Sequence, residues 1–121
     1  MNLSKHKQLI SDFSVKVDRL WNRVAAITLT EVLKKEVDLS KMDETCTQMR
    51  RISSQLSTTV NSAISDADYD DPEVEEQHTE IEQTVSQLDA KLDLIDQILT
   101  NLTSLQLIFD EANGADLFDL D

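Results

Sequence analysis

Residues 74–109 decide the fold class of this chain, and they read VEEQHTEIEQTVSQLDAKLDLIDQILTNLTSLQLIF. Seam positions recur there in alternating steps of four and three residues, and nine of the eleven are apolar. The eleven are Val74, His78, Ile81, Val85, Leu88, Leu92, Ile95, Leu99, Leu102, Gln106 and Phe109. A helix brings residues three and four apart onto one side. We therefore predict a coiled-coil-type helix over residues 73–112, roughly 60 Å long.

Two upstream segments show the same alternation. Residues 4–36 carry an apolar face that consists of Ile10, Phe13, Val17, Leu20, Val24 and Ile27. A second face, in the segment of residues 40–66 and its next residue, consists of Met42, Cys46, Met49, Ser53, Leu56, Val60, Ala63 and Ala67. Ser40 and Asp43 resemble a capping box at the start of the second segment. Val37–Ser40 forms a candidate corner between them, and one long bent helix is the alternative because no Gly or Pro enforces a break.

The supply of turn-forming residues excludes most folds that contain sheets. The chain has one glycine and one proline among 121 residues, whereas a compact sheet needs turn residues every ten residues or so. We predict an all-α fold, in which long amphipathic helices form an antiparallel coiled-coil hairpin or a three-helix bundle. Residues 1–112 form a single domain in this interpretation, and residues 113–121 form an acidic flexible tail.

The net charge of −13 is unevenly distributed. Residues 1–51 carry ten Lys/Arg and seven Asp/Glu, whereas residues 52–121 carry one lysine and seventeen acids. The acidic excess opposes binding to phosphate backbones and anionic membrane surfaces. No segment approaches 18 consecutive apolar residues, so we also expect no membrane insertion.

Charged side chains beside the seam predict how the helices pair. One flank of the 73–112 helix carries acids at every seventh residue, at Glu75, Glu82, Asp89 and Asp96. Such a stripe repels a parallel copy and suits a basic neighbour. The basic candidates are Lys34, Lys35, Lys41, Arg50 and Arg51. We therefore expect Arg50 and Arg51 to lie beside Asp89–Asp96 in an antiparallel hairpin.

The apolar face of the 73–112 helix broadens from about residue 98. Ile98 and Leu105 flank the seam, and Ile108 adds a further apolar position. A two-stranded seam needs a narrower stripe than this. The C-terminal third of the helix is therefore expected to sit among three or more helices. On the seam itself, His78 and Gln106 either lie where it opens to water or fix register and partner choice.

No residue pattern points to catalysis, a cofactor or a metal. Neither His6 nor His78 stands at a metal-like spacing from Cys46, and a cysteine among apolar seam residues is typical of a packed core. Asp66, Asp68 and Asp70 match the first positions of a calcium loop. The match fails where Asp71 and Gln77 replace its glycine and glutamate. We expect a non-enzymatic protein without cofactor or metal, in a reducing intracellular compartment (cytoplasmic or nuclear), since one cysteine cannot form an internal disulfide.

The C-terminal tail carries apolar residues among acids. Its candidate docking residues are Leu117, Phe118, Leu120 and Asp121. Leu117–Asp121 resembles the clathrin-box peptide, and Ala115–Phe118 resembles the end of the bacterial sliding-clamp-binding peptide. Both resemblances imply an apolar peptide that inserts into a groove of a basic partner.

Taken together, these patterns predict a protein-protein interaction or scaffold subunit that docks into a homo- or hetero-oligomeric helical assembly. The seam residues expected to contact the partner are Ile81, Val85, Leu88, Leu92, Ile95, Leu99, Leu102 and Phe109. The alternative is an acidic inhibitor or nucleic-acid mimic, of viral origin for example, whose carboxylates block a basic groove on an enzyme.

Overall fold

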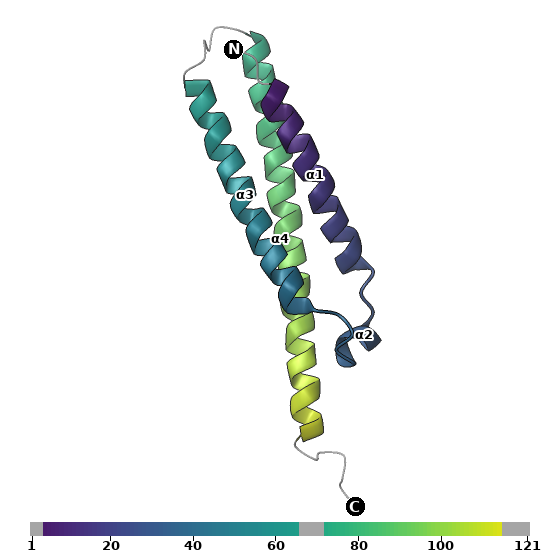
Figure 1. The fold of residues 1–121 in the computed structure, drawn as a ribbon. Helices are drawn as coiled ribbons and strands as arrows, with labels where there is room; N and C mark the ends of the chain where they lie inside the picture. The colour runs from purple at the N-terminus through teal and green to yellow at the C-terminus, as the bar shows by residue number, and fades with distance from the viewer. Residues whose placement is uncertain (1–3, 66–71, 115–121) are drawn as a thin grey trace, which may run out of the picture.

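The computed structural model describes residues 4–65 and 72–114, and in these ranges the chain is all-α, with four helices and no strand. The helices are α1 (Ser4–Ala25), α2 (Leu29–Leu33), α3 (Leu39–Ser65) and α4 (Pro72–Gly114). With 43 residues, α4 is about 65 Å long. Figure 1 shows that α4 extends well past the ends of α1 and α3. The bounds predicted from the sequence, 40–66 for α3 and 73–112 for α4, agree with the observed bounds to within two residues.

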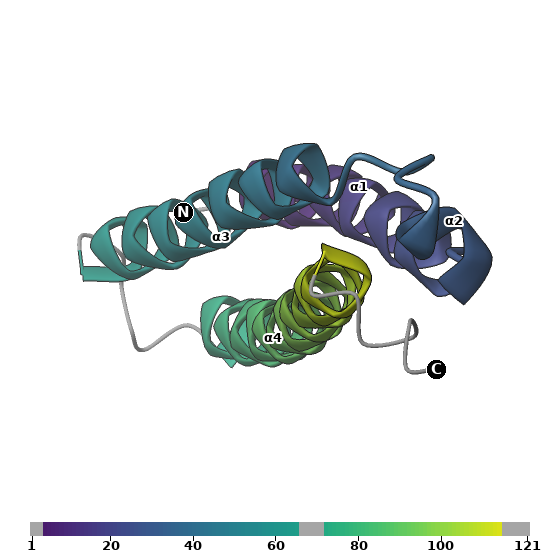
Figure 2. The same cartoon turned by 90° about the horizontal axis from the view of Figure 1, so that it is seen from below.

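The three long helices form a bundle in which α4 packs against both α1 and α3. Seen along the bundle in Figure 2, α1 and α3 form one layer and α4 forms the other. α1 runs parallel to α4, since Lys7 pairs with Glu80 and Asp18 pairs with Lys91. α3 runs antiparallel to α4, since Cys46 contacts Leu92 and Ser53 contacts Asp89. The all-α fold is confirmed, and its arrangement is the bundle of long helices, one of the two architectures that the sequence predicts.

The core consists of the apolar faces of the predicted helices. α1 contributes Ile10, Phe13, Val17, Leu20 and Val24, and α4 contributes Val74, Ile81, Val85, Leu88, Leu92, Ile95 and Leu99. Leu39, Cys46 and Val60 of α3 and Val32 of α2 complete the buried set. These residues are aliphatic with few exceptions, so burial of many small side chains along the bundle axis stabilises the fold.

The predicted helix over residues 4–36 is wrong in one respect, because it is two helices. α1 ends at Ala25 and α2 begins at Leu29. Thr28 caps α2: its Oγ1 accepts a hydrogen bond from the Glu31 N–H, and the Glu31 carboxylate accepts one from the Thr28 N–H. This reciprocal capping box satisfies two donors that a helix start leaves unpaired. The Thr28-x-x-Glu31 pattern is the sequence signal for the break.

α2 ends in a Schellman motif formed without glycine. The N–H of Glu36 donates to the carbonyl of Glu31, and the N–H of Lys35 donates to the carbonyl of Val32. Lys35 adopts a φ of 57°, which is the left-handed conformation that this motif requires. The sequence signal is weak, because a lysine stands where glycine is usual.

α3 begins at Leu39, and its capping residue lies two residues before the predicted capping residue Ser40. Asp38 precedes the helix, and its Oδ1 accepts a hydrogen bond from the Lys41 N–H at 3.0 Å. Ser40 already lies inside the helix, so the box of Ser40 and Asp43 is wrong. A break between the two helices is present as predicted, but it lies at residues 34–38, so only Val37 and Asp38 of the predicted corner fall in it.

Polar seam residues connect the helices to one another. Gln106 donates from Nε2 to the carbonyl of Val32 at 2.8 Å, which ties α2 to α4. Ser53 is buried, and its hydroxyl donates to the Asp89 carboxylate. His78 differs from these two, because its Nε2 lies 2.9 Å from Glu82 Oε1 within α4 itself. Gln106 therefore fixes the position of a neighbouring element instead of facing water.

The predicted pairing of α3 with α4 is confirmed for Arg50. Its guanidinium contacts the carboxylates of Asp93 and Asp96, with 3.4 Å between Nη1 and Asp96 Oδ2. Arg51 is exposed and makes no ion pair within residues 4–65 and 72–114. The two adjacent arginines thus provide a matched pair for testing the orientation of the helices.

We expect Arg50→Glu to destabilise the bundle by about 1–2 kcal/mol in low salt, because it replaces exposed ion pairs with repulsion from two carboxylates. This corresponds to a drop in Tm of roughly 5 °C. Added salt should restore much of the loss, since exposed charges are screened. Arg51→Glu is the control and should change Tm little at any ionic strength. Equal effects of the two substitutions in thermal unfolding would contradict the antiparallel contact.

Lys35→Gly should be more stable to urea unfolding than Lys35→Ala by about 1 kcal/mol, because alanine has the Cβ that disfavours the left-handed conformation. Both variants lose the ion pair between Lys35 Nζ and Asp110 Oδ2, which are 3.0 Å apart. The comparison between them therefore isolates the backbone effect. An Ala variant as stable as the Gly variant would show that the motif does not form in solution.

Candidate protein-binding surface

The C-terminal part of α4 extends past the level at which α3 begins. Leu39 is the first residue of α3, and the pocket at that corner reaches Leu99 on α4. Beyond this level Gln106 of α4 contacts α2, and Asp110 of α4 pairs with Lys35, which follows α2. α2 has five residues and covers one side of α4. The opposite side of the helix is accessible.

Apolar side chains concentrate on this accessible part. We call Leu102, Leu105, Leu107, Ile108 and Phe109 the apolar end of α4. Leu102 is partly buried against the core. The exposed fractions of the other four side chains are 46% for Leu105, 62% for Leu107, 62% for Ile108 and 38% for Phe109. Large apolar residues clustered on a surface are typical of an interaction site.

The predicted partner-binding seam divides into two parts. Its first six residues are buried within the chain, and they are Ile81, Val85, Leu88, Leu92, Ile95 and Leu99. Partner contact with this part would require α1 or α3 to move away. The last two residues, Leu102 and Phe109, lie in the apolar end of α4. Contact between the seam and a partner stays a prediction, and without rearrangement it is restricted to these two residues and their exposed neighbours.

The expected bundle around the C-terminal third of α4 is absent from the described part of this chain. Ile98 packs partly against the core, whereas Leu105 and Ile108 are exposed. Among the described helices, α2 and the first turns of α3 lie near this part of α4. Within residues 4–65 and 72–114, the face is therefore left uncovered on one side.

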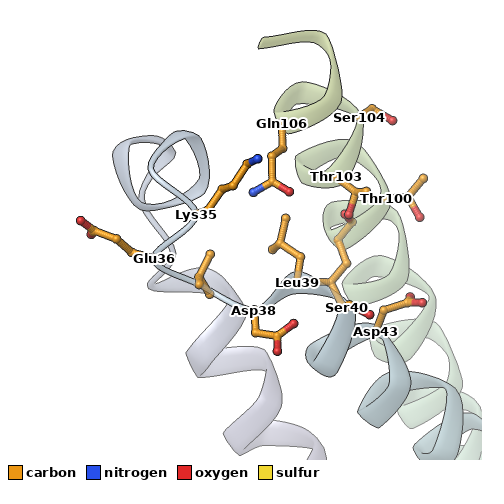
Figure 3. Close-up of a pocket in the computed structure, with 12 residues that line it drawn as sticks. Lys35, Glu36, Asp38, Leu39, Ser40, Asp43, Thr100, Thr103, Ser104 and Gln106 are labelled. Carbon is orange, nitrogen blue, oxygen red and sulfur yellow. The ribbon is translucent and has the colours of Figure 1, made fainter. Parts of the chain in front are cut away.

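A polar pocket of about 730 Å³ lies between the α2–α3 connection, the start of α3 and α4. Figure 3 shows Lys35 and Gln106 on one side of it, with Thr100 and Thr103 on α4 and Asp38 and Asp43 below. Asp38 already caps α3, and the Thr103 hydroxyl donates to the Leu99 carbonyl at 2.8 Å. Asp38 and Thr103 thus each have a partner within the fold.

A second, more apolar groove of about 380 Å³ lies between α1 and α3. Leu9 and Ile52 are exposed at its edges, and Phe13 is buried at its base. Asp12 and Lys16 also line it, so its charges are balanced. The groove exists because α1 and α3 pack mainly against α4 and less against each other. The sequence signal for this groove is Leu9, which widens the apolar face of α1.

Several candidate residues lie outside the described ranges. The acidic connector with Asp66, Asp68, Asp70 and Asp71 is one such segment. The candidate tail motif of Leu117, Phe118, Leu120 and Asp121 is the other. Within the described ranges, no group of three or more His, Cys, Asp or Glu side chains is arranged to hold a metal ion.

Cys46 is buried between α3 and α4. Its Sγ lies 3.6 Å from the Leu92 carbonyl, to which the thiol donates. Burial, together with the negative charge of Asp96, raises the pKa of the thiol to about 11. A thiol that keeps its proton at neutral pH is a poor nucleophile.

Comparison with known protein families, curated proteins and solved structures finds no match to this chain.

Cys46 of the native protein should react with a thiol-specific disulfide reagent at pH 8 at least 100-fold more slowly than in denaturant, because the site is closed and the thiolate scarce. The folded state holds the thiol proton more tightly than the unfolded chain. The contribution of the protonated Cys46 thiol to the free energy of unfolding is thus complete below pH 9 and declines as the pH rises towards 11. Cys46→Ala should lack this part of the alkaline decline in urea unfolding. Rapid labelling of the native protein would contradict the buried position.

Proposed function

We propose that this protein is a non-enzymatic interaction subunit that joins a helical assembly through the apolar end of α4. The observation that carries the proposal is that α4 extends past the ends of α1 and α3 (Figure 1) and exposes four large apolar side chains there. They are those of Leu105, Leu107, Ile108 and Phe109. An amphipathic helix that presents an apolar face to a groove or to another helix is a common recognition mode.

The stability of α4 supports the same proposal. Residues 100–114 extend beyond the α3 corner, and an isolated helix of about 15 residues is marginal in water. Tertiary packing is what stabilises most protein helices, and here α2 supplies it on one side. Full burial of a Leu, Ile or Phe side chain contributes about 1.5–3 kcal/mol, so half-exposed side chains contribute about 1 kcal/mol each. A partner at this surface would thus stabilise both the complex and the helix.

The setting of the protein belongs to the proposal. In the described ranges, no helix has the length and apolar character required to cross a bilayer. We place the protein inside the cell, in the cytoplasm or nucleus, because its single cysteine is packed as a thiol in the core. The partner that we propose is a helical protein, either a different chain or another copy of this one.

The acidic inhibitor or nucleic-acid mimic is less well supported. Mimicry needs carboxylates that are available to a basic groove. On α4, Glu80, Asp93, Asp96 and Asp110 are already paired with Lys7, Arg50 or Lys35. Because these carboxylates pair with basic side chains of the same chain, fewer acidic groups are available to a basic groove of another protein.

Ile108→Asp should weaken partner binding by at least about 30-fold, because it places a charge in an apolar contact; this corresponds to roughly 2 kcal/mol. Binding is measured by quantitative affinity purification of the tagged full-length chain from its native cell, alongside its self-association in light scattering. Gln83→Asp is the control, because it adds the same charge at an exposed α4 position inside the bundle. If Ile108→Asp changes neither copurification nor self-association, the proposal is wrong.

A further inference from the structure

We propose that the groove between α1 and α3 binds an acidic amphipathic helix of a partner protein. In Figure 2, α1 and α3 form one layer of the bundle and α4 forms the other. Every residue that lines the groove belongs to α1 or α3, and none belongs to α4. The groove is separate from the apolar end of α4, so this inference goes beyond the function proposed above and does not depend on it.

The floor of the groove is an apolar strip that both helices supply. Phe13 is buried, whereas Met49 and Leu56 are partly buried against the core. At the edges, Leu9 is 56% exposed and Ile52 is 42% exposed. A strip between two helices receives the apolar face of a further helix. An extended peptide fits less well, because the described part of the chain has no strand whose edge could pair with its backbone.

Basic side chains flank this strip. We call the five of them the basic flank, and they are Lys5, Lys16, Arg19, Arg23 and Lys41. Lys16 lines the groove itself, and each of the others stands three, four or seven residues from a lining residue of its own helix. Residues at these spacings share one helix face. All five are exposed, and within residues 4–65 and 72–114 none of them forms an ion pair.

Few acids oppose the basic flank. Asp12 lines the groove, and it accepts a hydrogen bond from Gln8 of the same helix at 3.0 Å. Glu44 stands four residues before the lining residue Gln48, and Arg51 stands three residues after it, so these two charges offset each other. The surroundings of the groove are therefore basic, although the whole chain has a net charge of −13.

This local reversal of sign follows from how the bundle pairs its charges. Lys7 of α1 and Arg50 of α3 face α4, and both form ion pairs with its carboxylates. The basic flank lies on other faces of α1 and α3, where α4 supplies no acid. A partner that brings its own carboxylates would therefore find uncompensated positive charge beside an apolar strip. Charge complementarity of this kind steers association and selects the partner.

A nucleic acid is a second kind of polyanion, and the groove suits it less well. A phosphate backbone has no apolar side chain with which to cover Leu9 and Ile52. The net charge of −13 also repels a long polyanion that extends past the basic flank. A short acidic helix stays within the flank, since salt screens the more distant acids over about 8–10 Å.

The test uses a synthetic helix of about 20 residues, with leucines at steps of three and four and glutamates elsewhere. Its binding to the full-length chain is measured by fluorescence anisotropy in low salt. Lys16→Glu should raise the Kd at least about tenfold, because it reverses a charge that lines the groove. Lys34→Glu is the matched control: it makes the same change of charge at an exposed residue that ends α2. Circular dichroism confirms that both variants remain helical.

Two further probes separate the apolar strip from bare charge. They are the same synthetic helix with serine in place of every leucine, and a single-stranded oligothymidine. Both should bind at least about tenfold more weakly than the leucine helix, because neither fills the apolar strip. If either binds as tightly and also depends on Lys16, the occupant is a simple polyanion and the amphipathic helix is wrong.

The remaining outcomes also decide the question. A leucine helix that fails to bind the unmodified chain at any attainable concentration overturns the inference. Binding that Lys34→Glu weakens as much as Lys16→Glu overturns the groove as its site. Either result leaves the proposed function of the apolar end of α4 intact, because that proposal is tested at Ile108.

Discussion

Burial of the α4 seam between α1 and α3 is the interaction on which the other helices depend. Leu92, Ile95 and Leu99 are almost completely buried, and they lie where α4 faces both neighbours. α1 and α3 pack against α4 more extensively than against each other, so loss of the seam would separate the two. The groove between α1 and α3 follows from this arrangement. Because the core is a row of aliphatic side chains, its stability grows with the length of overlap between helices.

The unequal lengths of the helices produce the candidate site. α4 has 43 residues, whereas α1 has 22 and α3 has 27. A helix longer than its neighbours must expose its apolar residues at one end or bury them against another molecule. In this chain the excess falls at the C-terminal end, where Leu105, Leu107 and Ile108 are exposed. The position of α2, held by Gln106 and Lys35, decides which side of that end is covered.

Much of the fold could be predicted from the sequence, and the exceptions have local causes. The heptad pattern predicts α3 and α4 closely because apolar periodicity spans many turns and tolerates a few polar residues. The break before α2 depends on a single capping box at Thr28. The apolar periodicity does not reveal this break, because it continues to Ile27, beyond the end of α1 at Ala25. Lys35 adopts a conformation that its residue type disfavours, and it does so because the Schellman hydrogen bonds and the contact with Asp110 hold it there.

The sequence by itself determined the helical class, the seam of α4 and the acid-base complementarity that sets α3 antiparallel to α4. These depend on periodicity and on charge, both of which can be read along one chain. Only the tertiary structure decided which seam residues are available. Ile81 and Leu99 share one pattern with Phe109, yet the first two are buried by α1 and α3 and the last is partly exposed. The physical reason is that accessibility depends on where the neighbouring helices end, and a periodic pattern contains no information about that.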